Sequence, residues 1–298
     1  MQIWPELPLE AWRDTKETLH RWTQVVGKIR MRLTPLINHW WNVPLYVTAR
    51  GLTTSEIPYG DRWFDMEFDF IAHVLRVRTN DGGEHDIPLG ARSVADLHDE
   101  VFRVLNALDI SCRIWTVPVE IENPIPLDRD EHHASYDREY VERFWRILAL
   151  SHAVFTDFRA EFIGKCSPVH FFWGGFDLAV TRFSGRPAPP RPDADAITRE
   201  GYSHEVSSVG WWPGDSRLPQ ASFYSYAAPE PEGFRTSAVS PAATYYNEPL
   251  NGFYLHYDDM RRLENPERAL LDFCHSTYDA AAKTGQWDPA LIRRPPAG

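Results

Sequence analysis

One stretch of the sequence gathers side chains that could do chemistry. Between residues 167 and 186 it carries His170, Asp177, Arg182 and Arg186 among aromatic residues. Imidazole and carboxylate groups can exchange protons with a bound molecule, and a guanidinium can hold an anionic group through two parallel hydrogen bonds. The stretch therefore predicts a site for a small polar or anionic molecule, with Arg182 or Arg186 binding its anionic part.

A second polar pair, His204 and Glu205, opens a later predicted strand. Antiparallel pairing of that strand with the first would bring His204 or Glu205 within reach of His170. We then expect His170 or His204 to act as general base. Glu205 or Asp177 would hold the imidazole in the orientation that proton transfer requires.

The same side chains allow two other interpretations. Two histidines and a carboxylate could form a facial triad for zinc or non-haem iron, although no HExxH or HxH spacing supports it. Alternatively, His170 and His204 cap strand ends through hydrogen bonds, and Asp177 pairs with Arg182. The cofactor stays open, and we assign no metal ligands from the sequence.

An earlier aromatic cluster of Asn38, His39, Trp40 and Trp41 follows a predicted helix. If the chain is an internal duplication, symmetry places His39 opposite His170 across the joint between two repeats, where pockets are common. Asn38 and His39 would contact the ligand there. Indole rings make flat walls for a ligand, and core packing is their other use. The candidate walls are Trp40, Trp41, Trp173 and Trp211.

The elements that must position these residues follow from periodicity. Apolar residues three to four positions apart predict a long amphipathic helix over 9–33, which Pro35 ends. Alternation of apolar and acidic residues predicts a half-buried strand over 63–70. The sequence 80–83 is a tight hairpin turn, and Ser93 caps a second helix that reaches residue 108. Further strands are predicted over 43–50, 73–79 and 86–89.

The second half repeats this order after an extended segment over 110–121 and a proline-containing linker. A helix over 136–162 precedes strands over 169–183, 203–211 and 222–226. Asn265 as N-cap, Pro266 at the first helical position and Gly285 after the end predict a closing helix over 266–284. We therefore predict an α+β fold of two helix/antiparallel-sheet/helix pseudo-repeats in one compact unit. The repeats span 1–122 and 136–298, with 123–135 as linker.

Composition limits the partners. A formal net charge of −11 repels phosphate backbones, so we expect no nucleic-acid partner. No apolar run approaches the ~18 residues of a membrane span, and the N-terminus lacks a secretory pattern. Cys112, Cys166 and Cys274 are far apart and form no CxxC pair, which suits a reducing compartment. We expect a cytoplasmic protein with no membrane attachment.

Motifs of several common enzyme classes are missing from the sequence. It has no GxGxxG that opens a helix after a strand, no GxxxxGK[ST] and no GxSxG. These patterns serve dinucleotide binding, P-loop nucleotide binding and α/β-hydrolase catalysis respectively. The sequence gives those three classes no support.

Several long strings resemble a bacterial family known as domain of unknown function 5996. They are Thr23 to Lys28, Asn38 to Trp41, Tyr46 to Thr54, His170 to Arg186 and Tyr202 to Glu205, and the resemblance extends over almost the whole chain. It implies a bacterial cytosolic protein that is a single family-length unit. It implies no reaction, cofactor or catalytic residue.

The residues therefore favour an enzyme-like protein that acts on a small polar or anionic molecule in an aromatic-lined cleft between the repeats. Two alternatives stay open. One is a non-catalytic binding module in which tryptophans stack on a small ligand, and the other is a scaffold protein with no pocket. The oligomeric state and whether the protein is an enzyme are not predicted.

Overall fold

The computed structural model describes residues 3–291, which form an α+β fold with six α-helices and two antiparallel sheets. The chain divides into two units that each collect separate segments. Unit 1 comprises the described residues up to 36, together with 42–149 and 171–177. Unit 2 comprises residues 37–41 and 150–170 and the described residues from 178 onward.

Unit 1 begins with helix α1 (Leu9–Leu33), which has the predicted bounds. Its apolar stripe is buried, including Trp12, Leu19 and Trp22. It ends before Pro35 because proline disfavours the helical conformation in the residue that precedes it, and Thr34 is extended. Much of its polar side is also buried, which a simple amphipathic pattern did not predict: Thr15, Lys16, Thr18, His20, Arg21, Thr23, Gln24, Lys28 and Arg30.

The sheet of unit 1 has the order β1-β2-β4-β5-β6, with β3 paired to β4. Alternation places Phe64, Met66 and Phe68 of β4 in the core, as predicted, while Asp65 and Glu67 point to the other face, where both bind Arg78. The strands are β1 (Tyr46–Val47), β2 (Gly51–Thr53), β3 (Ile57–Tyr59), β4 (Arg62–Asp69), β5 (Val74–Thr79) and β6 (Glu84–Pro88).

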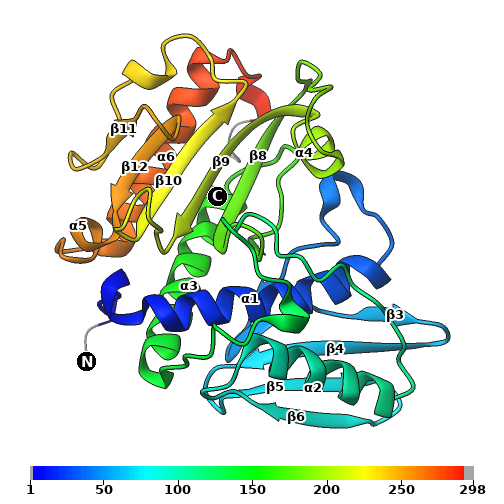
Figure 1. Ribbon diagram of the computed structural model, residues 1–298. Coiled ribbons are helices and arrows are strands. Elements are labelled where there is room, and N and C mark those ends of the chain that lie inside the picture. Colours follow the sequence, from blue (N-terminus) through cyan, green and yellow to red (C-terminus); the bar gives the residue numbers. More distant parts are fainter. Residues whose placement is uncertain (1–2, 292–298) are drawn as a thin grey trace. The chain divides into compact units, whose positions relative to one another are not determined.

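Helix α2 (Val94–Ala107) lies alongside this sheet (Figure 1). A complete capping box begins it: the Ser93 hydroxyl accepts from the Asp96 amide at 3.0 Å, and the Asp96 carboxylate accepts from the Ser93 amide at 3.4 Å. This satisfies two of the amide groups that a helix start leaves without intrahelical partners. The predicted cap is therefore confirmed.

We expect Ser93→Ala to lower the free energy of unfolding by about 1 kcal/mol, the usual cost of removing an N-cap side chain. Urea denaturation measures it. Ser111→Ala is the control, because Ser111 is exposed and its recorded bonds are made by its backbone. A change in Ser93→Ala no larger than in the control would contradict the assigned cap.

Helix α3 (Arg138–Ala160) contributes its first half to unit 1 and its second half to unit 2. The unit 2 sheet has the order β11-β12-β10-β9-β8-β7, and helix α6 (Pro266–Thr284) contacts β9 and β10. Asn265 caps α6 as predicted, with its side chain accepting from the Arg268 amide. The strands are β7 (His170–Phe172), β8 (Asp177–Pro187), β9 (His204–Trp212), β10 (Ser222–Ala228), β11 (Tyr245–Asn247) and β12 (Gly252–His256).

The single strand predicted over 169–183 is wrong. A turn over 173–176 separates β7 from β8, with Phe176 in the left-handed region at φ 60°. Gly174 and Gly175 lower the cost of such a reversal, so alternation of side chains does not continue through it. Six helices and strands were also not predicted, because their segments are short or rich in turn residues: β2, β3, α4 (Ala196–Gly201), β11, β12 and α5 (Tyr257–Arg261).

The predicted α+β class is confirmed. The two antiparallel sheets are separate, and each unit contains helices and one of the sheets. The internal duplication, and the boundaries at 122 and 136 that rest on it, stay predictions.

Candidate functional site

A lysine and a histidine meet in unit 2. Lys165 Nζ lies 2.5 Å from Nε2 of His39. The other ring nitrogen of His39, Nδ1, is 2.9 Å from the backbone carbonyl of Glu200. A carbonyl only accepts, so Nδ1 carries the proton, and in the neutral ring Nε2 is the acceptor for Lys165. We call His39, Lys165, Glu200 and His204 the Lys165 site.

His39 is held in an unusual conformation. It lies in the 3-10 turn η1 (Asn38–Trp40) at φ 61°, and Trp40 follows at φ 59°. Residues other than glycine pay for this left-handed backbone, and such positions cluster at functional sites. The side chain of Glu200 compensates, since its Oε1 accepts from the His39 amide at 3.0 Å. Helix α4 thus fixes both the backbone and the ring of His39.

The backbone of Lys165 is fixed by strand β8. The Phe183 amide donates to the Lys165 carbonyl at 3.0 Å, and Cys166 forms a bridge to Arg182. The Lys165 residue is exposed, while its ammonium lies 5.5 Å from the ring centroid of Trp41 and 5.0 Å from that of Phe183. The lysine therefore reaches solvent but keeps its head group against aromatic rings.

The pKa values of both ionisable groups of this contact are lowered. Burial lowers the pKa of the Lys165 amine. Burial also lowers the pKa of His39, and the nearby charges of Lys165 and His204 lower it further against the opposing Glu200 carbonyl bond. Among residues 3–291 no carboxylate forms an ion pair with Lys165. The arrangement supplies an amine that loses its proton more readily than an ordinary lysine.

His204 completes the site from the first position of β9. Its ring meets the ring of His39 edge-on, with centroids 5.7 Å apart. Ser203 Oγ lies 3.1 Å from His204 Nδ1, which orients the imidazole. Among the predicted bases, His204 is therefore the one whose ring contacts the ring of His39.

Glu205 and Arg186 form an ion pair with each other. Glu205 Oε2 lies 2.7 Å from Arg186 Nη2 and also accepts from Ser184 Oγ at 2.8 Å. Arg186 donates further to the carbonyls of Gly285 and Gln286. Glu205 therefore anchors an arginine rather than orienting His204 in this structure. Its catalytic role and the substrate-binding role of Arg186 stay predictions.

The remaining residues of the early aromatic cluster divide between the site and its surroundings. The Trp41 ring contacts the rings of His39 and His170, with centroids 5.5 and 5.9 Å away. His39 and His170 thus approach through one shared indole. His170 is fully buried, Trp40 is half-buried and Asn38 is exposed.

Arg182 lies in a different environment from the one that substrate binding requires. Its side chain is 0% exposed, and its guanidinium carbon is 3.5 Å from the ring centroid of Phe158 and 4.3 Å from that of Tyr278. One guanidinium nitrogen donates to the Phe158 carbonyl. Burial lowers the pKa of Arg182 to about 10. Within residues 3–291 no ion pair joins Arg182 to Asp177.

Three other predicted residues lie outside the Lys165 site. Trp211 is 0% exposed and packs on Tyr257 in the core of unit 2. Trp173 belongs to unit 1, where its indole nitrogen donates to the Val43 carbonyl at 2.9 Å. Asp177 also belongs to unit 1 and begins β8. Their predicted roles stay untested.

The metal hypothesis needed two histidines and a carboxylate in one place. Within residues 3–291 no three histidine, cysteine, aspartate or glutamate side chains gather in a way that could hold a metal ion. His170 and His204 therefore do not share a ready-made coordination sphere. None of the helices that the structure describes is long and apolar enough to cross a membrane.

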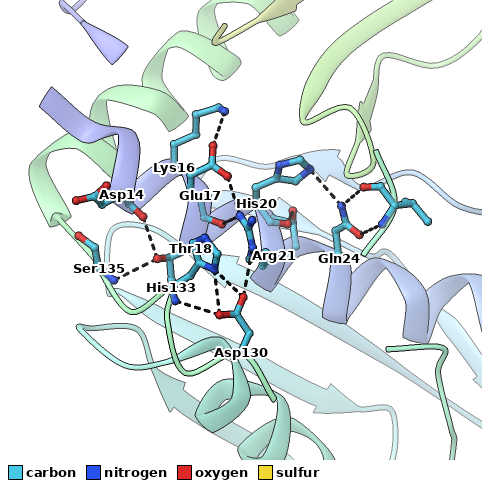
Figure 2. Close-up of polar contacts among 12 residues, drawn as sticks. Asp14, Lys16, Glu17, Thr18, His20, Arg21, Gln24, Asp130, His133 and Ser135 are labelled. Carbon is cyan, nitrogen blue, oxygen red and sulfur yellow. Dashed lines mark hydrogen bonds and ion pairs between the residues drawn. The ribbon is translucent and has the colours of Figure 1, made fainter. Parts of the chain in front are cut away.

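Unit 1 contains a second polar cluster, which Figure 2 shows around helix α1. Asp130 is fully buried and binds Arg21 Nε at 3.3 Å and His133 Nδ1 at 2.7 Å. Arg21 also binds Glu17 at 2.7 Å, so opposite charges alternate along the cluster. We call Glu17, Arg21, Asp130 and His133 the α1 ion network.

The two clusters differ in whether their cationic group already has a carboxylate partner. Arg21 of the α1 ion network is paired with two carboxylates, and the backbone amides of His132 and His133 donate to Asp130. Lys165 has no such carboxylate. We therefore take the Lys165 site as the functional candidate and the α1 ion network as a structural element.

Sequence reasoning missed Lys165 and Glu200. Composition could have drawn attention to Lys165, because lysine is rare in this chain and nearly all its basic residues are arginines. The lysines are Lys16, Lys28, Lys165 and Lys283. No signal marked Glu200, since its role depends on the fold of a loop. The ring of Phe183 contacts both Lys165 and His39. Phe183 lies within the predicted stretch 167–186, but no role was assigned to it.

Comparisons with known proteins place the chain in a family but give no activity. A family model described as "Family of unknown function (DUF5996)" matches residues 4–294. Searches of curated proteins and of solved structures found no match.

Proposed function

Because the chain belongs to the DUF5996 family, which carries no assigned activity, we propose a function from the Lys165 site: imine-forming catalysis on a small polar carbonyl compound. The observation that carries it is the 2.5 Å contact between Lys165 Nζ and the acceptor nitrogen of His39. A nucleophile in contact with a base that a third group orients is the usual signature of covalent catalysis. Glu200 is the third group.

The proposed step uses groups that the site contains. His39 Nε2 takes a proton from the Lys165 ammonium, and the resulting imidazolium keeps its Nδ1 proton on the Glu200 carbonyl. The free amine attacks the substrate carbonyl carbon, and a C–N bond forms as the C=O π bond breaks. The oxygen takes one proton from the attacking nitrogen and a second from the His39 imidazolium. It then leaves as water as the nitrogen lone pair forms the C=N bond, which gives the protonated imine and restores neutral His39. His204 is placed to exchange one of these protons.

The substrate is small and polar, as the sequence suggested. Trp41 and Phe183 supply aromatic walls beside the amine, and the cations of the site favour an anionic or strongly polar molecule. The aromatic cleft between repeats and the cytoplasmic location expected from the sequence stay part of the proposal. Asp177, Glu205 and His170 are kept as candidates that this step does not require.

We expect Lys165 to react with carbonyl probes far faster than Lys283, which is exposed at the end of α6. The protein would be treated at pH 7 with glyoxylate or D-glyceraldehyde and sodium cyanoborohydride, and the adduct located by peptide mass spectrometry. A lysine with a lowered pKa has more free amine at this pH, so we expect Lys165 to be labelled several-fold faster than Lys283.

Two matched variants test the assignment. Lys165→Arg keeps the charge but cannot form an imine, and it should lose the fast adduct, while Lys283→Arg should keep it. Equal initial labelling of Lys165 and Lys283, or a fast adduct that persists in Lys165→Arg, would overturn the proposal.

A second candidate function is binding of a small anion without chemistry. It is favoured by the absence of a carboxylate on Lys165 within the described residues and by His204 beside it. Lys165→Arg separates the two functions. A binding module would keep its affinity for pyruvate or phosphate in this variant, because arginine retains the charge, whereas imine trapping would be lost.

A further inference from the structure

The open face of the unit 2 sheet carries a row of tyrosines. Strand register places Tyr224 of β10 opposite Gly210 of β9 on one side and Tyr254 of β12 on the other. Tyr226 lies two positions along β10, on the same face, opposite Ser208. The other face of β10 carries Phe223, which is buried against Phe155 of α3. Helices thus cover one face, and tyrosines line the opposite face.

The ring of Tyr224 lies flat on the sheet. A Cβ atom added to Gly210 would come 2.4 Å from both Cζ and the hydroxyl oxygen of Tyr224. The absence of a side chain at Gly210 therefore makes room for the ring across strand β9. The Tyr226 ring is within 16° of parallel to it, with centroids 6.2 Å apart, and both residues are half-buried. Tyr224 and Tyr226 form what we call the tyrosine platform.

Hydroxyl groups surround this platform. The hydroxyls of Tyr226 and Tyr202 are 2.8 Å apart, and those of Ser208 and Thr181 are 2.9 Å apart in the neighbouring strands. A flat aromatic surface with hydroxyl groups at its edge suits a ring that has an apolar face and polar edges. A sugar ring has this character, since its C–H groups pack on an aromatic face while its hydroxyls accept and donate.

The platform is continuous with the Lys165 site. Tyr202, Tyr226 and Trp41 all pack against a small core cluster that contains Phe183. The Phe183 ring is 4.7 Å from that of His39, and its centroid is 5.0 Å from Lys165 Nζ. One ligand with a ring and a carbonyl group could therefore contact both places.

We infer that the substrate class is a reducing sugar, whose ring portion packs on the tyrosine platform and whose open-chain aldehyde or ketone meets Lys165. The carbonyl half of this inference rests on the function proposed above. Sugar binding by the platform does not, because it needs no covalent step. The net charge of −11 disfavours a polyanionic ligand such as nucleic acid on the same rings.

The test uses sugars with and without a carbonyl group. Saturation-transfer NMR and calorimetry would be run with D-glucose, D-galactose, D-mannose and D-ribose, and with the methyl glycoside of each. We expect at least one reducing sugar and its methyl glycoside to bind. Tyr224→Ala should weaken both at least ten-fold, whereas Tyr140→Ala, a half-buried tyrosine of α3 in unit 1, should leave them unchanged.

Further variants separate the two halves of the inference. Tyr226→Phe keeps the ring and loses one hydroxyl, so it should fold and bind several-fold more weakly. Lys165→Arg should keep methyl-glycoside binding and lose the trapped adduct with the reducing sugar. Failure of every sugar to bind, or binding unchanged in Tyr224→Ala and Tyr226→Phe, would overturn the platform. If glyoxylate is trapped on Lys165 while no sugar binds, the proposed function stands and the substrate class is wrong.

Discussion

Asp130→Ala is expected to lower the free energy of unfolding by about 3–5 kcal/mol, the usual cost of removing one partner from a buried ion pair. Asp130 is fully buried, and its removal would leave Arg21 without one of its two carboxylates. It would also free two backbone amides, those of His132 and His133, from the oxygen that accepts them. Buried donors that lose their acceptor are costly.

Asp128→Ala is the matched control. Asp128 lies two residues earlier in the same segment, and it is half-buried with one carboxylate oxygen that accepts no hydrogen bond in the described structure. It should change stability by at most about 0.5 kcal/mol, like most substitutions away from such features. Urea unfolding of both variants at pH 7 decides. If Asp130→Ala costs no more than Asp128→Ala, the α1 ion network does not stabilise unit 1.

Asp130→Asn tells the charge apart from the hydrogen bonds. The amide oxygen can still accept from the His132 and His133 backbones, but the side chain no longer carries the charge that faces Arg21. We expect the free energy of unfolding of Asp130→Asn to lie between those of the wild type and of Asp130→Ala. A loss equal to that of the alanine variant would assign the whole effect to the charge.

Periodicity predicted elements that local packing controls. The helix over 9–33 has its predicted ends, and the buried alternation of β4 is that of the sequence, because both patterns are set by which side chains meet the core. The cap residues Ser93 and Asn265 were also predicted correctly, since a cap depends on residues within one turn.

The candidate site could be predicted only in part, because it depends on separate segments. His39, Trp41 and His204 were recognised by residue type, and the fold brings them together. Lys165 joins them through the backbone hydrogen bond that its carbonyl accepts from Phe183 of β8, and Glu200 joins them from the six-residue helix α4. The environment of Arg182 was not predicted, and its role in anion binding stays a prediction. Its position suggested anion binding, but aromatic rings enclose it, which spacing along one strand cannot reveal.

The stability of the protein is expected to fall as the pH drops from about 6.5 to about 4, and His20 accounts for a large part of the fall. Burial, together with the nearby charge of Lys16, lowers the pKa of His20 from 6.5 to about 4. The folded state therefore binds fewer protons than the unfolded state in this window, so stability rises with pH across it. Each pKa unit is worth about 1.4 kcal/mol, which gives about 3–4 kcal/mol for this shift.

The structure explains why protonation is costly there. His20 Nε2 is 2.8 Å from the Gly174 carbonyl and donates to it in the neutral ring, while Lys16 and Arg21 add positive charge nearby and Glu17 opposes them. Glu17 acts in the same direction at lower pH. Its pKa is lowered to about 2 although burial alone would raise it, because Lys16 and Arg21 stabilise the carboxylate. Its contribution is present above pH 4.5 and is lost toward pH 2.

His20→Gln separates the contribution of His20 to the pH dependence of stability from the contributions of the other titrating groups. A glutamine amide can donate to the Gly174 carbonyl but does not titrate, so the variant should show a shallower dependence of unfolding free energy on pH between 6.5 and 4. His85→Gln, on the exposed strand β6, is the control for removal of a surface histidine. Urea denaturation at pH 7.5, 6.0, 5.0 and 4.5 gives the three slopes. If the unfolding free energy of His20→Gln depends on pH as steeply as that of the wild type and the control, protonation of His20 does not cause the loss of stability.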